Sequence, residues 1–270
     1  PGRTPHQNLR FLAIISIVVK ALNDHAGVLV AQISSPGNSL RLGGNEAPPT
    51  ILSVFLGSML ESILETISKG DVAVGTEQGI LDLGVTHIPN ISKDYTDRNR
   101  TSPFAFTGNK FEFRAVGSSA NVSVPMATLN AAVTSAAKEA TERLKGYLDS
   151  SKTRDEAIVL LVKNLIEENK NVLFSGDNYS KKWLEEAANR GLPKIEKCSD
   201  AIEVMRDSNA TKFLVDATVL TSDEIISRVN ISLNRYVTTK SIEMQTLSEM
   251  INIFVVPAVE KQLHQSHSVL

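Results

Sequence analysis

The segment Asp97–Arg114, DRNRTSPFAFTGNKFEFR, carries more information about fold and chemistry than any other stretch of this 270-residue chain. Its last five residues alternate charged and aromatic side chains, and successive side chains of a strand point to opposite faces. We therefore expect a strand within residues 104–116 that buries Phe111 and Phe113. The opposite face would carry Lys110, Glu112 and Arg114. Such a row can hold a metal with its carboxylate and anionic groups with its cations. By pattern alone, a half-buried strand with a solvated charged face explains the segment as well, because short alternations are common.

A second informative segment, Ser39–Pro49 (SLRLGGNEAPP), lies upstream. Arg41 precedes two glycines, which adopt backbone angles closed to other residues, and Glu46 stands just before two prolines. The pattern predicts a mobile loop with one cation and one carboxylate. An ordinary polar connection between two helices would look the same.

Taken together, these segments resemble the glutamine synthetases, and most closely their large type III form. The resemblance rests on NEAPP (45–49) after an Arg-containing loop, and on NRTSPFAFTGNKFEFR (99–114) about fifty residues later. It continues through NYSKKWLEEAANRGLP (178–193) and the C-terminal helices, so it covers nearly the whole chain. It implies that residues 1–149 are the C-terminal part of a catalytic domain, with a flap loop at 36–49 and a catalytic strand at 104–116. Residues 150–270 would form a C-terminal helical region.

Composition excludes several classes of protein. The chain is 42% hydrophobic, enough for a large core, and its net charge of −2 gives no basic field for nucleic acid. Its one cysteine, Cys198, excludes an intrachain disulfide framework and suits a reducing compartment. The apolar run 11–19 is too short to span a bilayer, and no cleavage-site pattern follows it. We expect a cytoplasmic protein with neither membrane nor nucleic acid as a partner.

Periodicity and capping signals predict a helix-rich α+β fold with short antiparallel strands around the charged segment. Capping boxes start helices after Thr153 and Thr221, Ser180 caps another, and Gly70 ends one. Strands are predicted at 72–74 and 80–85. Helices are predicted at about 7–34, 49–69, 125–148, 154–169, 181–190, 200–207 and, with a kink at Pro257, 222–264.

The resemblance implies ATP-dependent ligation of ammonia to glutamate through a γ-glutamyl phosphate, with Mg²⁺ or Mn²⁺ neutralising phosphate charge. It assigns flap closure over the acyl phosphate and deprotonation of ammonium to Glu46, and metal binding to Glu112. Arg41 and Arg114 would bind glutamate. Arg100 would contact the transferring phosphate and Lys110 the nucleotide phosphates, and Arg98 is a further, structural candidate.

The chain departs from the family pattern at two places. Better-known forms carry another phosphate-binding arginine in the stretch that here reads SPFAF (102–106), and Leu40 stands before Arg41 where a polar or aromatic residue is expected. Because that arginine is missing here, we expect Lys110 to take over part of the binding of the nucleotide phosphates.

Further metal ligands, including a histidine, lie upstream in the family, and its sites form between adjacent subunits of a ring. None of the five histidines here has ligand-like spacing. We therefore expect a C-terminal portion of a longer homo-oligomeric protein, with stacked rings, that acts on glutamate, ammonia and ATP and is inactive as this chain alone. The alternative is a non-catalytic relative that keeps the fold for assembly or regulation.

Overall fold

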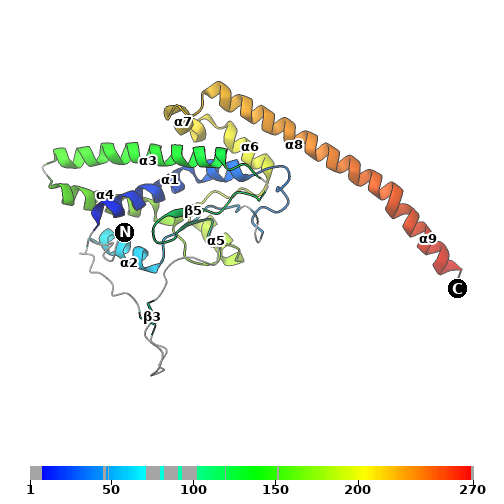
Figure 1. Ribbon diagram of the computed structural model, residues 1–270, viewed down its shortest axis with the longest axis horizontal. Helices are drawn as coiled ribbons and strands as arrows, with labels where there is room; N and C mark the ends of the chain where they lie inside the picture. The colour runs from blue at the N-terminus through cyan, green and yellow to red at the C-terminus, as the bar shows by residue number, and fades with distance from the viewer. Residues whose placement is uncertain are drawn as a thin grey trace.

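The computed structural model describes residues 8–44, 47, 49–70, 80–81, 91–92, 102–118, 120–150 and 152–268. A layered helical body surrounds α1 (Leu9–Ile33), which packs against α3 (Ser123–Asp149), α4 (Arg154–Asn169) and α6 (Cys198–Arg206), as Figure 1 shows. Smaller contacts come from α7 (Ser208–Asp216), a helix that the sequence patterns did not reveal. The helix-rich α+β class is confirmed.

The central helix α1 is strongly apolar. Within the described ranges it is the one helix long and apolar enough to cross a membrane, with a mean hydropathy of 1.6 over its best window, but 61% of that window is buried inside the fold. Its one buried cation, Lys20, pairs with Asp24 at 2.8 Å and with Glu139 of α3 at 3.1 Å. Burial opposes the charge on Lys20, but the hydrogen bonds to these carboxylates outweigh it and raise its pKa. α1 thus packs as the core helix of the body.

The strand predicted within residues 104–116 is two strands, which corrects the expectation of one. β4 (Phe104–Phe106) and β5 (Phe111–Phe113) form an antiparallel hairpin with Ala105 opposite Glu112. The connection closes with a hydrogen bond from the Thr107 amide to the Lys110 carbonyl at 2.9 Å, and Gly108 has φ +92°, a conformation that favours glycine. A turn therefore interrupts the segment between its two aromatic pairs.

The sheet is mixed, with strand order β1-β4-β5. β1 (Val54–Phe55) pairs with β4 in parallel, an addition to the antiparallel strands that we expected. β2 (Ile80–Leu81) and β3 (Ile91–Ser92) form a separate antiparallel pair. The strand predicted at 80–85 is described only at 80–81, and the one predicted at 72–74 lies outside the described residues.

The helix predicted to open at the proline pair begins later, at Ser58 (α2, Ser58–Ser68). The apolar residues that precede it form β1 and its buried flanks, so their pairing with β4 outweighs a helical pattern. Gly57, with φ +86°, separates strand from helix. The predicted stop at Gly70 is confirmed, with φ +83°.

The predicted capping boxes are confirmed at Thr153 and Thr221, as is the Ser180 cap of α5 (Lys181–Asn189). The second box starts α8 (Ser222–Met250), which continues through a π-helical segment, Ile251–Val255, into α9 (Val256–His267). These three elements make one long rod that leaves the body and ends far from it (Figure 1). The π turn ends two residues before Pro257, whose missing N–H and ring disturb the regular helical bonding of the preceding turn.

Most of the buried apolar side chains form one core, which runs from Leu12 to Val229 and so crosses the domain boundary predicted at residue 150. Trp183 of α5 is 1% exposed and stacks on Phe174 with ring centroids 3.8 Å apart, as a packing anchor does. The boundary itself stays a prediction.

Candidate functional site

An aromatic cluster fixes the position of the β4–β5 hairpin. The Phe104 ring lies 5.1 Å from Phe111 and 5.9 Å from Phe113, and Phe106 lies 5.2 Å from Phe111. Phe11 of α1 adds a contact of 5.8 Å to Phe106. Such tilted and offset pairs stabilise more than area burial alone, so the hairpin is tied to the central helix.

The other face of β5 carries the charged row. Glu112 accepts from Lys110 Nζ at 3.1 Å and from Arg114 Nε at 2.9 Å, each through a different carboxylate oxygen. The hydrogen bond from Lys110, and then that from Arg114, hold the pKa of Glu112 below its ordinary value. Glu112 is therefore an anion at neutral pH, held between two cations.

The loop that carries Arg41 is anchored at both ends by one segment of the chain. The Cys198 amide donates to Ser39 Oγ at 3.1 Å, and the Ile195 amide donates to the Thr50 carbonyl at 2.9 Å. Successive turns follow between these anchors, including bonds from the Arg41 amide to the Asn38 carbonyl and from the Gly44 amide to the Arg41 carbonyl. The base of the loop is thus held by the helical part of the chain.

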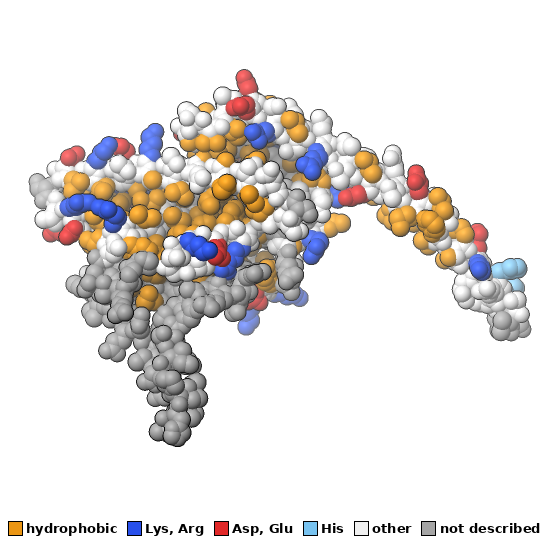
Figure 2. All heavy atoms as spheres, viewed as in Figure 1, with side chains coloured by type: hydrophobic (Ala, Val, Ile, Leu, Met, Phe, Trp, Pro, Cys, Tyr) orange, Lys and Arg blue, Asp and Glu red, His pale blue; other side chains and the backbone are white. Residues whose placement is uncertain are grey.

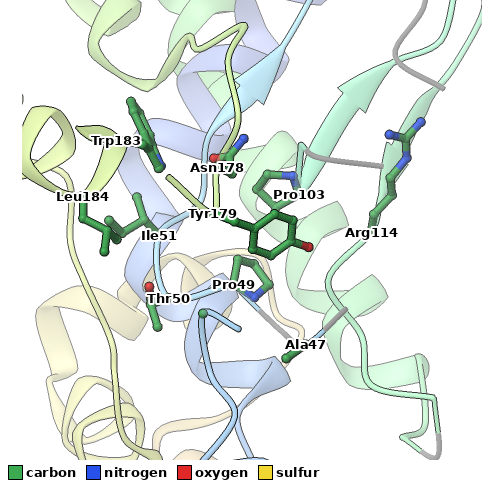
Figure 3. Close-up of a pocket in the computed structure, with 11 residues that line it drawn as sticks. Ala47, Pro49, Thr50, Ile51, Pro103, Arg114, Asn178, Tyr179, Trp183 and Leu184 are labelled. Carbon is green, nitrogen blue, oxygen red and sulfur yellow. The ribbon is translucent and has the colours of Figure 1, made fainter. Parts of the chain in front are cut away.

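Loop, hairpin and α5 meet at an open pocket of about 480 Å³, its open mouth included. Figure 3 shows Tyr179 beside Pro49 and Pro103, with Trp183 and Arg114 on opposite sides of the pocket. The lining residues come from three regions far apart in sequence: Gly43, Ala47, Pro49, Thr50 and Ile51; Pro103 and Arg114; Asn178, Tyr179, Trp183 and Leu184.

The pocket includes one of the site residues that we predicted, Arg114, beside the loop residues Gly43 and Ala47. Glu112 and Lys110 are joined to Arg114 by the ion pairs of the charged row but do not line the pocket. Arg41 is solvent-exposed and does not line it either. The predicted residues Glu46, Arg98 and Arg100 lie outside the described part of the chain.

Sequence reasoning missed Asn178 and Tyr179 as pocket residues. Ser53 Oγ donates to Asn178 Oδ1 at 2.6 Å, which holds the amide at the pocket beside the end of β1. Asn178 Nδ2 is buried and has no hydrogen-bond partner among the described residues. The pair opens the motif NYSKKWLEEAANRGLP, which carries part of the family resemblance and, at Ser180, a helix start. Spacing alone does not show which remote loop faces that motif.

The described residues do not by themselves form a complete metal site. Over the ranges that the structure describes, no group of three His, Cys, Asp or Glu side chains could hold a metal ion. Glu112 is one carboxylate whose two oxygens already face cations, whereas hard divalent ions take six or more oxygen ligands. Further ligands would have to come from other residues.

Residues 157–268 match the model of the glutamine synthetase C-terminal domain. The chain is 38% identical to a type-3 glutamine synthetase of Dictyostelium discoideum over 258 residues, 96% of this chain and 35% of that protein. It is also 38% identical to a glutamine synthetase of Bacteroides fragilis, over 95% of this chain and 36% of the relative. A glutamine synthetase of Butyrivibrio fibrisolvens is 35% identical over 93% of this chain and 35% of its own length.

The chain therefore spans about a third of the length of the relatives that it matches. The three matches each cover more than nine-tenths of this chain. The helix-rich body with its small mixed sheet agrees with the helix-rich α+β fold expected from the sequence. This chain is a partial-length member of the glutamine synthetase family, similar to the type III form.

Proposed function

We propose that this chain supplies one wall of a glutamine synthetase active site, in which ATP phosphorylates glutamate and ammonia displaces the phosphate to give glutamine. One observation carries the proposal: Arg114 of the hairpin lines the same pocket as Gly43 and Ala47 of the loop. A guanidinium in a partly enclosed pocket, beside a loop able to cover it, suits a carboxylate substrate. The similarity to the relatives described above supports the same assignment.

In this proposal Arg114 binds the glutamate carboxylate. Because its Nε donates to Glu112, the plane of the guanidinium is fixed by that bond and not by solvent. Glu112, kept anionic by Lys110 and Arg114, would be one ligand of the Mg²⁺ or Mn²⁺ that the family uses with ATP, and Lys110 would contact nucleotide phosphates. The residues that the structure describes do not complete the site of that metal.

The remaining roles fall to residues of the same two motifs. Glu46 would cover the acyl phosphate and deprotonate ammonium, and Arg100 would stabilise the transferring phosphoryl group. Arg41, on the exposed side of the loop, would reach glutamate only when the loop covers the pocket. The division into a catalytic part up to residue 149 and a helical part from 150, and the cytoplasmic location, belong to the same proposal.

The experiment is an assay of glutamine and phosphate formation from glutamate, ammonia and ATP by the intact protein that carries this chain. Glu112→Ala should abolish most of the activity. Glu203→Gln, which removes an exposed carboxylate paired with Arg206 on α6, is the matched control and should leave activity unchanged. Normal glutamine formation by Glu112→Ala would refute the proposed role. An intact protein that assembles but forms no glutamine would favour the non-catalytic alternative.

A further inference from the structure

Tyr179 brings a polar group to the pocket that the roles proposed above leave unused. Figure 3 shows its ring between Pro49 and Pro103, with the hydroxyl directed to the side of the pocket that carries Arg114. Tyr179 is half-buried, and none of the residues that the structure describes forms a hydrogen bond with its hydroxyl. A phenol O–H can donate one hydrogen bond and accept others, so this group is available to a ligand of the pocket.

The backbone that carries Tyr179 is fixed on both sides. The Tyr179 amide donates to Asp177 Oδ1 at 2.9 Å, which closes a turn before it. The buried Ser53 Oγ donates to Asn178 Oδ1 at 2.6 Å and ties the same turn to the end of β1. Ser180, the next residue, caps α5. Because the turn is held in this way, little conformational freedom is lost when the hydroxyl binds a ligand.

The position of Tyr179 relative to Arg114 is set through Pro103. The Arg114 amide donates to the Pro103 carbonyl at 2.7 Å, so these two residues pair at the open end of the β4–β5 hairpin. The ring of Tyr179 lies beside Pro103 in the same pocket. A guanidinium from the hairpin and a hydroxyl from the turn before α5 therefore line one pocket, each on an element that is fixed by its own hydrogen bonds.

The lining of the pocket suits a carboxylate on an aliphatic chain. Arg114 is the only charged residue among the described residues that line it. Ile51, Trp183 and Leu184 add apolar surface to the same lining. A carboxylate accepts hydrogen bonds from both a guanidinium and a phenol, and methylene groups are buried favourably against apolar side chains. An acidic amino acid such as glutamate offers both parts.

A chain of phosphates suits the pocket less well. Transferring phosphates are bound by several cations and metal ions, whereas the other described lining residues of this pocket are uncharged. Lys110 pairs with Glu112 and does not line the pocket. On the face of the molecule that Figure 2 shows, the described Lys and Arg side chains are scattered among Asp and Glu and form no broad basic patch. The chemistry of the lining therefore assigns the Tyr179 hydroxyl to the amino-acid substrate and not to the nucleotide.

We propose that the Tyr179 hydroxyl donates a hydrogen bond to the glutamate carboxylate that Arg114 binds, which makes Tyr179 a substrate-binding residue. This inference rests on the function proposed above and adds a contact to it. The bond is made in the enzyme–substrate complex and is kept through the reaction. Because it stabilises the bound substrate and the transition state alike, it lowers the KM for glutamate and leaves kcat unchanged.

Tyr179→Phe in the intact protein tests the contact, because it removes only the hydroxyl and keeps the ring beside the two prolines. The KM for glutamate should rise about tenfold, since a hydrogen bond to a charged group is lost, while kcat and the KM for ATP change by less than about twofold. Tyr236→Phe is the matched control, because it makes the same change on α8 at a partly buried residue that does not line the pocket. An unchanged KM for glutamate, or an equal rise in the KM for ATP, would overturn the proposal.

Equilibrium dialysis of labelled glutamate against the intact protein separates this inference from the proposed function. ADP takes the place of ATP, so that no phosphoryl group is transferred, and the wild type should bind glutamate about tenfold more tightly than Tyr179→Phe. If the protein forms no glutamine but the variant loses this affinity, the proposed function fails and the contact stands. If the protein forms glutamine and both forms bind glutamate equally, the contact fails and the proposed function stands. No measurable binding by the wild type would also overturn the contact.

Trp183 provides the structural control, because it is the only tryptophan of the 270-residue chain and lines the same pocket as Tyr179. The fluorescence emission maximum of this chain should be the same in the wild type and in Tyr179→Phe, since the buried indole keeps its packing on Phe174. A shift to longer wavelength in the variant would show that the pocket wall had loosened. That result would overturn the assignment of the change in KM to the lost hydroxyl.

Discussion

Arg114 Nε donates a hydrogen bond to Glu112 Oε2 at 2.9 Å. Arg114 lines the pocket and Glu112 does not, so a residue outside the pocket orients the guanidinium group inside it. The two residues stand on one face at the end of β5, and the aromatic cluster on the opposite face fixes that strand. An apolar core thus sets the geometry of a polar site. The first prediction follows from this division.

Arg114→Lys should raise the KM for glutamate of the intact protein by roughly tenfold or more, because a lysine cannot bridge Glu112 and a carboxylate substrate with one planar group. Steady-state kinetics with glutamate as the varied substrate measures the effect. Arg206→Lys, an exposed arginine paired with Glu203 on α6, is the control. An unchanged KM would mean that Arg114 does not bind glutamate.

Phe104→Ala should lower the free energy of unfolding by about 3–5 kcal/mol, because the side chain is 2% exposed and contacts two other rings. Urea unfolding followed by circular dichroism provides the measurement. Val159→Ala on α4, 39% exposed, should cost about 0.5 kcal/mol or less. A similar cost for both substitutions would contradict the account of the aromatic cluster.

Two glycines with open surroundings should respond in opposite directions to alanine. Gly191 has φ +73° at the end of α5, so Gly191→Ala should destabilise by about 1 kcal/mol or more although no atom lies within 4 Å of the new methyl group. Gly146 lies within α3 with equally open space, so Gly146→Ala should stabilise by about 0.5–1 kcal/mol. Thermal unfolding of both variants tests the pair, and a shift in the same direction would contradict it.

His25 should make stability depend on pH near neutrality. Its ring stacks on Phe213 with centroids 3.9 Å apart, and burial, helped by Lys20, lowers the pKa of His25 against the opposite influence of Asp24. A histidine whose pKa is lower in the folded state stabilises the fold at pH values above its pKa in the unfolded chain, about 6.5. This contribution is lost as the pH falls through the lower pKa of the folded state.

The midpoint temperature of thermal unfolding should therefore decrease when the pH is lowered from 7.5 to 5.5. The decrease should be smaller in His25→Phe, which keeps a stacked ring. His264→Gln on the exposed rod should follow the wild-type profile. An unaltered pH dependence in His25→Phe would exclude His25 as the source.

Local signals predicted most helices well and the sheet less well. Capping boxes and terminal glycines act over a few residues, so α4, α5 and α8 begin where their caps are. The start of α2 was wrong because residues 54–55 gain a parallel partner fifty residues away, and no local pattern reports such pairing. The Gly-Asn pair at 108–109 predicts a turn, but a single strand over 104–116 does not use that turn to divide the segment.

The candidate site was predictable only as two motifs. The alternation in KFEFR predicted the row that the ion pairs of Glu112 display. The third wall of the pocket could not be found this way, because Asn178 and Tyr179 reach it through the tertiary packing of α5. The roles of Arg41, Glu46, Arg100, Lys110, Glu112 and Arg114 stay predictions.

The anchoring of Ser39 and Thr50 by residues 195–198 has a consequence for variation in length. Both ends of the intervening segment are fixed to one short stretch, and the entropy of a closed loop changes by only about 0.6 kcal/mol when its length doubles. The fold should therefore tolerate insertions between Ser39 and Thr50. A one-residue insertion between Ile195 and Cys198 would move apart the two amides that anchor the loop, so both hydrogen bonds could not form together. Changes in length therefore have room between Ser39 and Thr50 and almost none within residues 195–198.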